Sequence, residues 1–245
     1  MAGHSKWKNI MHKKAKTDAQ RAKVFTKIGK EMCMAVKEGG ADPVSNSKLK
    51  DLIAKAKSFN VPNDNIERII KKASGSDDIN YEKTIYEGYG PSGVAVIVEC
   101  MTDNRNRTSG DVKHYFDKYG GNLGATGCVT YLFNEKGIIV VDADGIDEDK
   151  FMEDTIEAGA VDFSREQGEN EGEEVFEVFT EPNLLSSVGA ALEKMGYKFL
   201  SSEVDKIPSA YVSLESEEDI SKMEKLLEHL EDSDDVVNIW HNLSE

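Results

Sequence analysis

Apolar residues in the first third of the chain recur with the period of an α-helix. In residues 17–37 they fall, at 100° per residue, within an arc of about 120°. The members of this arc are Val24, Phe25, Ile28, Met32, Ala35 and Val36. Turn residues at 39–43 follow, and the helical period resumes over residues 47–58 and 63–75, with Asn63 as a favourable N-cap. The pattern predicts a bundle of three helices.

After residue 80 the pattern changes to short runs rich in β-branched and aromatic residues, which favour strands. Strands are predicted at 84–89, 94–101 and 129–133, with a helix at 107–119. The chain then reads strand, helix, strand, strand, helix, strand at residues 137–141, 147–158, 161–164, 175–180, 182–195 and 197–204. A further strand, helix and strand are predicted at residues 210–214, 217–230 and 236–240.

The order βαββαβ is that of a ferredoxin-like fold, which is complete in itself. The three elements that follow it therefore need partners, and the strands before it can supply them. We predict a multidomain α and α+β protein with a discontinuous middle domain. Its parts are a basic helical domain at 1–78, an α+β domain at 79–134 plus 207–245, and an inserted ferredoxin-like domain at 135–206.

Charge is distributed unevenly along the 245 residues, whose net charge is −16. Residues 1–75 contain 17 Lys and Arg against 7 Asp and Glu, and the rest of the chain contains 13 against 39. Such asymmetry is typical of a polyanion-binding protein. No apolar run approaches the roughly 20 residues of a membrane span, and the N-terminus lacks a secretory h-region. We expect a cytoplasmic protein without a membrane partner.

Lysines of the first predicted helix gather on the side opposite its apolar arc, within roughly 80° of the helical wheel. This lysine stripe comprises Lys16, Lys23, Lys27, Lys30 and Lys37. Ammonium groups neutralise phosphates, so we predict that Lys16, Lys23, Lys27 and Lys30 contact nucleic acid.

The preceding segment 3–16, GHSKWKNIMHKKAK, combines cations with aromatic rings. A planar ring can stack on a base at roughly 1–3 kcal/mol while neighbouring lysines bind phosphate. The alternative is a frayed basic tail with Trp7 packed on the helical bundle. The continuity of charge with the lysine stripe favours binding. The predicted contacts in this segment are Lys6, Trp7, Lys8, His12, Lys13 and Lys14.

A second candidate contact lies in segment 102–109, TDNRNRTS, which joins a predicted strand to a helix. Arg105 and Arg107 lie near the helix N-terminus, where the helix dipole disfavours cations by roughly 0.3–1 kcal/mol each. A phosphate would be bound by both arginines and by the free N–H groups of the helix. Internal salt bridges to the many carboxylates are the alternative, and the sequence leaves both open.

Two glycine-rich segments lack the context of nucleotide-binding loops. Gly88-Tyr-Gly-Pro-Ser-Gly93 contains a proline and leads into a strand, so it predicts a turn between strands. Segment 120–127 has no Gly-Lys-Ser/Thr ending and is interpreted as a shaped loop, with recognition as one role. Neither a nucleophile motif nor metal-ligand spacing of His and Cys is found. We therefore expect no enzyme activity, metal, cofactor or small-molecule substrate.

Several segments resemble the YebC/PmpR family, bacterial proteins named as probable transcriptional regulators, with a mitochondrial relative that activates translation of cytochrome c oxidase subunit I. The matching stretches are MAGHSKWKNI, the spacing Asp18, Arg21 and Phe25-Thr-Lys, PNDNIER at 62–68, YEGYGP at 86–91, TDNRNRT at 102–108, GGNLG at 120–124, and Ile207-Pro208. Met11 and Cys128 depart from the expected polar or basic residue and small hydroxyl. The resemblance implies three domains, arranged as above, without catalytic residues.

The family resemblance and the charge pattern together predict a nucleic-acid-binding regulator of gene expression, in the first place a DNA-binding transcriptional regulator. The second hypothesis is a factor associated with rRNA in the ribosome, which activates translation or relieves stalling, with ribosomal proteins or tRNA facing the acidic domains. The third is a protein–protein adaptor that works through the acidic domains. A start at MAGHSKW without a transit-like extension favours a bacterial cytosolic member.

Overall fold

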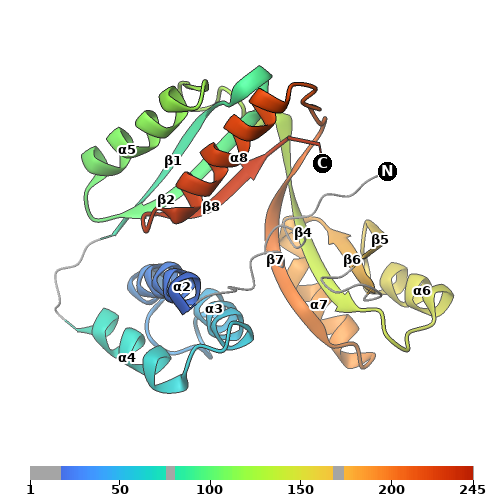
Figure 1. Ribbon diagram of the computed structural model, residues 1–245. Helices are drawn as coiled ribbons and strands as arrows, with labels where there is room; N and C mark the ends of the chain where they lie inside the picture. Colours follow the sequence, from blue (N-terminus) through green and yellow to red (C-terminus); the bar gives the residue numbers. More distant parts are fainter. Residues whose placement is uncertain (1–17, 76–80, 168–173, 245) are drawn as a thin grey trace. The chain divides into compact units, whose positions relative to one another are not determined.

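The computed structural model describes residues 18–75, 81–167 and 174–244 (Figure 1). Within these ranges the protein has mixed α/β architecture, with seven α-helices and two antiparallel four-stranded sheets. It divides into two compact units. Among the described residues, 133–209 form one unit, and the larger unit contains those from 18 to 132 together with 210–244. In these ranges no helix combines the length and apolar character that crossing a membrane requires.

Three helices open the larger unit. They are α2 (Asp18–Gly39), α3 (Ser47–Ser58) and α4 (Asn63–Ser74), close to the predicted bounds. Their apolar residues form one core in which Ile28, Met32, Leu49 and Ile66 are buried. The helical periodicity of the sequence is confirmed because each helix buries the face on which its apolar residues recur.

Two helices cover one face of the first sheet, whose strand order is β3-β1-β2-β8 (Figure 1). The strands are β1 (Glu82–Tyr89), β2 (Ala95–Thr102), β3 (Asn122–Leu123) and β8 (Val236–His241). The helices are α5 (Arg105–Lys118) and α8 (Glu217–Asp232). Val96, Val98, Phe116 and Leu226 belong to the core between the sheet and these helices.

The turn between β1 and β2 is the short helix η1 (Pro91–Gly93), so the prediction of a turn here is confirmed. Ser92 and Gly93 have φ of 52° and 83°, the left-handed conformation that glycine adopts without strain. Close approach explains a second glycine, because a Cβ at Gly88 would lie 2.5 Å from the carbonyl oxygen of Asn122 on β3.

The unit at 133–209 contains the second sheet, with strand order β5-β6-β4-β7. Its elements in chain order are β4 (Phe133–Asp142), α6 (Glu148–Ala158), β5 (Asp162–Gln167), β6 (Glu174–Thr180), η3 (Pro182–Leu184), α7 (Leu185–Lys194) and β7 (Phe199–Pro208). Phe151 of α6 and Leu192 of α7 pack on Phe176 and Val178 of β6. The predicted element order βαββαβ is therefore present.

Two predicted strands are wrong. Residues 129–132 do not form a strand, because η2 (Thr130–Leu132) turns the chain before β4 begins at Phe133. The backbone N–H groups of Val129 and Thr130 donate to the side chain of Glu87 instead of to a neighbouring strand. The predicted strand at 210–214 is reduced to a single bridge, between Val212 and Leu243.

Smaller differences concern helix ends and domains. Asn63 is the first residue of α4, and Pro62 precedes it as a cap without a side-chain hydrogen bond, so the proposed Asn63 cap is wrong. Helix 182–195 begins as η3 before α7. The predicted division into three domains stays a prediction, and the linker at 76–80 lies outside the described residues.

Candidate nucleic-acid interface

Seven of the predicted nucleic-acid contacts precede the described part of the chain. They are Lys6, Trp7, Lys8, His12, Lys13, Lys14 and Lys16. The structure describes the other five, which lie on α2 and on the first turn of α5. They are Lys23, Lys27, Lys30, Arg105 and Arg107.

The helical spacing of α2 places Lys23, Lys27 and Lys30 on one side of the helix. Lys23 Nζ lies 2.7 Å from Asp232 Oδ1, and Lys27 Nζ donates to the carbonyl of Glu231 at 2.6 Å. Both acceptors lie in the last turn of α8, where free carbonyl groups give the helix end a negative partial charge. This part of the lysine stripe therefore already contacts an anionic surface within the same unit.

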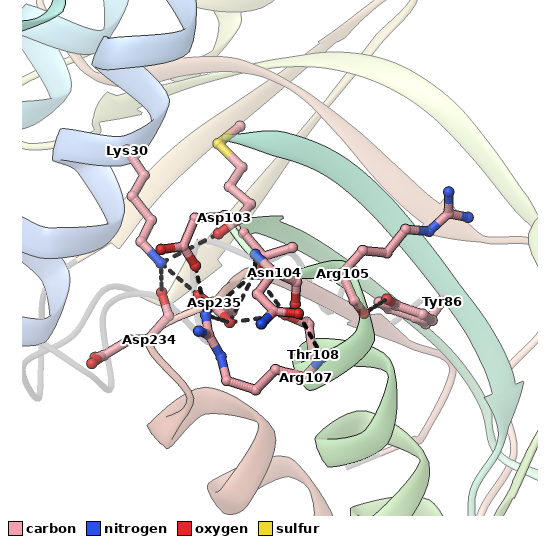
Figure 2. A network of polar contacts seen from close by, with 11 residues as sticks. Lys30, Tyr86, Asp103, Asn104, Arg105, Arg107, Thr108, Asp234 and Asp235 are labelled. Atoms are coloured by element: carbon pink, nitrogen blue, oxygen red, sulfur yellow. Dashed lines mark hydrogen bonds and ion pairs between the residues drawn. The ribbon is translucent and has the colours of Figure 1, made fainter. Parts of the chain in front are cut away.

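Lys30 lies in a buried polar network (Figure 2). Its Nζ donates to the carbonyl of Asp234 at 2.8 Å and to Asp235 Oδ1 at 2.7 Å, and lies 3.3 Å from the carbonyl of Met101. Lys30 is 9% exposed, although its place in the stripe predicted an outward ammonium group. A phosphate contact by Lys30 stays a prediction, and it would require this network to open.

Asp235 is the common acceptor of the network, and its second carboxylate oxygen faces a different element from the first. Arg107 Nη2 lies 2.8 Å from Oδ2, and the hydroxyl groups of Thr108 and Thr102 lie 2.9 and 3.1 Å from it. Asp235 is 7% exposed. A single carboxylate thus joins α2 to the end of β2 and the start of α5.

The electrostatics of this carboxylate follow from its neighbours. Burial by itself raises the pKa of Asp235, but hydrogen bonds from Lys30, Arg107 and Thr108 outweigh burial and hold the pKa well below its usual range. The same contact to Asp235, together with Asp103, raises the pKa of Arg107. Asp235 and Arg107 are therefore both charged at neutral pH.

The segment 102–108 supplies most of the partners because it forms the start of α5. Asn104 is the N-cap, and its side chain accepts from the backbone N–H of Arg107 at 3.1 Å. Thr102 ends β2, and its hydroxyl accepts from the N–H of Asn104 at 2.9 Å. These local bonds bring Thr102, Arg107 and Thr108 to one point beside Asp235.

The two arginines of this segment differ in their surroundings. Arg107 pairs with Asp103 at 2.9 Å and with Asp235, which is the internal arrangement that the sequence left open. Arg105 is exposed, and Figure 2 shows its guanidinium directed away from the network. Both residues are exposed, and phosphate binding stays a prediction for both, but only Arg107 would have to give up ion pairs within the described ranges to bind phosphate.

Other cations of the helical bundle are exposed and were not singled out from the sequence. Lys50 and Lys57 are seven positions apart on α3 and therefore share one face, and Lys71 lies on α4. Among the described residues these three lysines have no ion-pair partner. Unlike Lys23 and Lys30, none of the three forms an ion pair among the described residues. Burial raises the pKa of Asp51, however, and the charge of Lys50 acts to lower it.

Glu87 shapes the glycine-rich loop that follows β3. Its carboxylate accepts from the backbone N–H groups of Gly127 at 2.7 Å, Val129 at 3.0 Å and Thr130 at 2.9 Å. Burial acts to raise the pKa of Glu87, but these hydrogen bonds leave it below its ordinary value. The loop at 120–130 is thus held by an internal anion.

Sequence reasoning did not identify Asp235 or Glu87. Asp235 belongs to no motif in the sequence, and its partner Lys30 is 205 positions away. The sequence does offer a clue to Glu87, because a carboxylate in a predicted strand beside a glycine-rich segment can accept from the backbone N–H groups of that segment. In the described ranges no cluster of three His, Cys, Asp or Glu side chains is placed to hold a metal.

Comparison with known proteins covers nearly the whole chain. Residues 5–76 match the model of the TACO1/YebC protein N-terminal domain, and residues 81–243 match that of the TACO1/YebC second and third domain. A probable transcriptional regulatory protein of Acetivibrio thermocellus is 54% identical over 99% of this chain and 98% of the relative. One of Finegoldia magna is 51% identical over the same shares. The crystal structure of a conserved hypothetical protein from Aquifex aeolicus is 45% identical, with a TM-score of 0.83 over 98% of this chain and 97% of the other.

Proposed function

The chain belongs to the TACO1/YebC family, and from this we propose that it regulates gene expression by binding nucleic acid, in the first place DNA. The curated relatives named above are called probable transcriptional regulatory proteins, which supports a regulatory role. Their names specify no enzymatic activity. The proposal takes residues 135–206 as a ferredoxin-like domain inserted into the middle domain, and the cytoplasm as the place of action.

The observation that carries the proposal is the excess of cations in residues 1–75, 17 Lys and Arg against 7 Asp and Glu. Phosphate contacts supply most of the sequence-independent affinity of nucleic-acid-binding proteins. In this proposal the contacts come from the segment 3–16, from Lys23 and Lys27 of the lysine stripe, and from exposed Lys50, Lys57 and Lys71. Arg105 adds a contact on α5.

A second candidate function is action on the translating ribosome through rRNA. It is favoured by the family resemblance, which includes a mitochondrial relative that activates translation. The matching models group YebC with TACO1 in one family. The exposed lysines fit rRNA and duplex DNA equally well, since both present phosphate groups.

Co-sedimentation with ribosomes in the presence of excess duplex DNA separates the two candidates. A DNA-binding regulator leaves the ribosome as competitor DNA is added, whereas a ribosome-associated factor remains in the pellet. Absence from the ribosome pellet, with no binding to DNA at any salt concentration, contradicts both and leaves an adaptor that binds proteins through its acidic residues.

The triple substitution of Lys50, Lys57 and Lys71 by glutamine tests the contacts themselves. If all three lysines bind phosphate, the slope of log K against log salt falls in magnitude by about 2–3, at roughly 0.7–0.9 per contact. Fluorescence anisotropy with a labelled duplex and with an rRNA fragment measures this slope.

A matched control removes three cations from the other unit. Lys150, Lys194 and Lys198 are exposed, and their replacement by glutamine changes the net charge by the same amount. An equal reduction of the slope in both triple variants would show that net charge, and not the helical bundle, determines binding.

A further inference from the structure

The end of α8 and the residues just after it present a row of acceptor oxygens to Lys23, Lys27 and Lys30. Glu231 contributes a carbonyl to Lys27, Asp232 contributes a carboxylate to Lys23, and Asp235 contributes a carboxylate to Lys30. The three lysines follow each other at spacings of four and three residues along α2. Like the phosphate oxygens of a nucleic-acid backbone, these oxygens accept hydrogen bonds from ammonium groups, and those of Asp232 and Asp235 also carry negative charge.

The contacts differ in strength along the stripe. The pair Lys30–Asp235 is buried, with 10% of each side chain exposed, and it is fixed further by Arg107, Thr102 and Thr108. The pair Lys23–Asp232 is open to solvent, with 37% and 65% of the side chains exposed. Exposed ion pairs contribute only about 0–1 kcal/mol and are screened by salt. The Lys23 end of the contact is therefore the end that an external anion can displace.

We propose that the last turn of α8 is an internal competitor that occupies Lys23 and Lys27, and that nucleic acid reaches these two lysines by displacing it. Lys30 and Asp235 remain joined and act as the anchor about which the contact opens. The inference rests on the proposed function, since it concerns how the same basic surface is regulated. Because α8 competes for Lys23 and Lys27, the affinity for nucleic acid is lower than the number of lysines alone would give.

The test is Asp232→Asn in the full-length protein, with a labelled DNA duplex and an rRNA fragment as probes, by fluorescence anisotropy at low ionic strength. Freeing Lys23 is expected to raise affinity about two- to fivefold, which corresponds to the range of an exposed ion pair. The gain in affinity from Asp232→Asn should disappear in a Lys23→Gln background, because Asp232 then has no Lys23 ammonium group to release.

Glu224→Gln is the matched control. Glu224 is exposed on α8, and its substitution changes the net charge by the same single unit. Equal gains from Asp232→Asn and Glu224→Gln, or a gain that persists in the Lys23→Gln background, would overturn the inference while leaving the proposed function intact. Binding by Asp232→Asn where the unmodified protein binds weakly supports both. Absence of binding by every variant to either probe overturns the proposed function, and the inference with it.

Discussion

Asp235 neutralises two cations that come from elements far apart in the chain, Lys30 of α2 and Arg107 of α5. Each of its two oxygens has its own partners. Oδ1 accepts from Lys30, and Oδ2 accepts from Arg107 and from the hydroxyl groups of Thr102 and Thr108. Buried charges are tolerated when each has a partner and are costly when one is left alone. We therefore expect substitutions of Asp235 to lower the free energy of unfolding more than they change the affinity for nucleic acid.

Asp235→Ala is expected to lower the free energy of unfolding by about 3–5 kcal/mol, because it leaves the ammonium of Lys30 buried without its carboxylate. Urea denaturation followed by circular dichroism measures the loss. Asp103→Ala is the control, since it removes the exposed partner of Arg107 and should cost only about 0–1 kcal/mol. Similar losses for the two variants would show that the buried pair contributes no more than the surface pair.

The depressed pKa of Asp235 also sets a pH dependence. Because the folded state holds the carboxylate ionised, the unfolded state binds more protons once the pH falls towards the ordinary aspartate pKa of about 3.9. The stabilisation is complete above that value and is lost as the pH drops towards the pKa of the folded state. Denaturation midpoints measured from pH 7 to pH 3 should therefore fall more steeply for the unmodified protein than for Asp235→Asn.

Glu87 is expected to control the loop at 120–130 locally. Glu87→Gln replaces one acceptor oxygen by an NH₂ group that faces N–H donors, and an unsatisfied buried donor costs about 1–3 kcal/mol. Hydrogen exchange should accelerate at the amides of Gly127, Val129 and Thr130 and remain unchanged in α2. Glu82→Gln, on the exposed end of the same strand, serves as the control, and identical exchange in the two variants would contradict the role of Glu87.

At the scale of elements, Asn46 joins two helices of the bundle. Its side-chain oxygen caps α3 by accepting from the N–H of Leu49 at 3.0 Å, while its Nδ2 donates to the carbonyls of Ala35 and Gly40 at 2.8 Å each. Gly40 follows the end of α2, whose last carbonyls lack partners within the helix. One buried amide thus satisfies the start of α3 and the end of α2.

Asn46→Ala is expected to destabilise the protein by about 1–3 kcal/mol, more than the roughly 1 kcal/mol of a typical cap, because the carbonyls of Ala35 and Gly40 also lose their donor. Asn46→Ser isolates the cap, since a hydroxyl can still accept from Leu49 but cannot reach both carbonyls. Denaturation should place this variant between Asn46→Ala and the unmodified protein. A serine variant no more stable than the alanine variant would contradict the importance of the cap.

The elements themselves were predictable wherever periodicity and burial agree. The helix at 47–58 has the predicted bounds because its apolar residues Leu49, Leu52 and Ala56 are the ones it buries. The strand predicted at 129–133 failed because the carboxylate of Glu87, some forty positions away, binds its N–H groups. Likewise the lysine stripe was visible in the sequence, whereas its contact with α8 depends on residues more than two hundred positions away.

At the scale of the whole molecule, charge is separated along the chain. Residues 133–209, which form one of the compact units, contain 6 Lys and Arg against 20 Asp and Glu. This net charge of −14 accounts for most of the −16 of the whole chain. Acidic surface repels a polyanion, so this unit should weaken and orient binding by the basic region.

The ends of this unit lie side by side, because Phe133 and Pro208 are partners in the pairing of β4 with β7 and Asn134 Nδ2 donates to Ser209 Oγ at 3.0 Å. Replacing residues 133–209 by a short glycine–serine linker should therefore leave the larger unit folded, with its helical circular dichroism retained. Affinity for duplex DNA at low salt should rise roughly tenfold or more, since the variant loses fourteen net negative charges. The gain must vanish near 1 M salt, where the Debye length is only about 3 Å. Weaker binding by a folded deletion variant would instead mean that residues 133–209 contribute contacts of their own, and that their acidic groups do not act by repulsion alone.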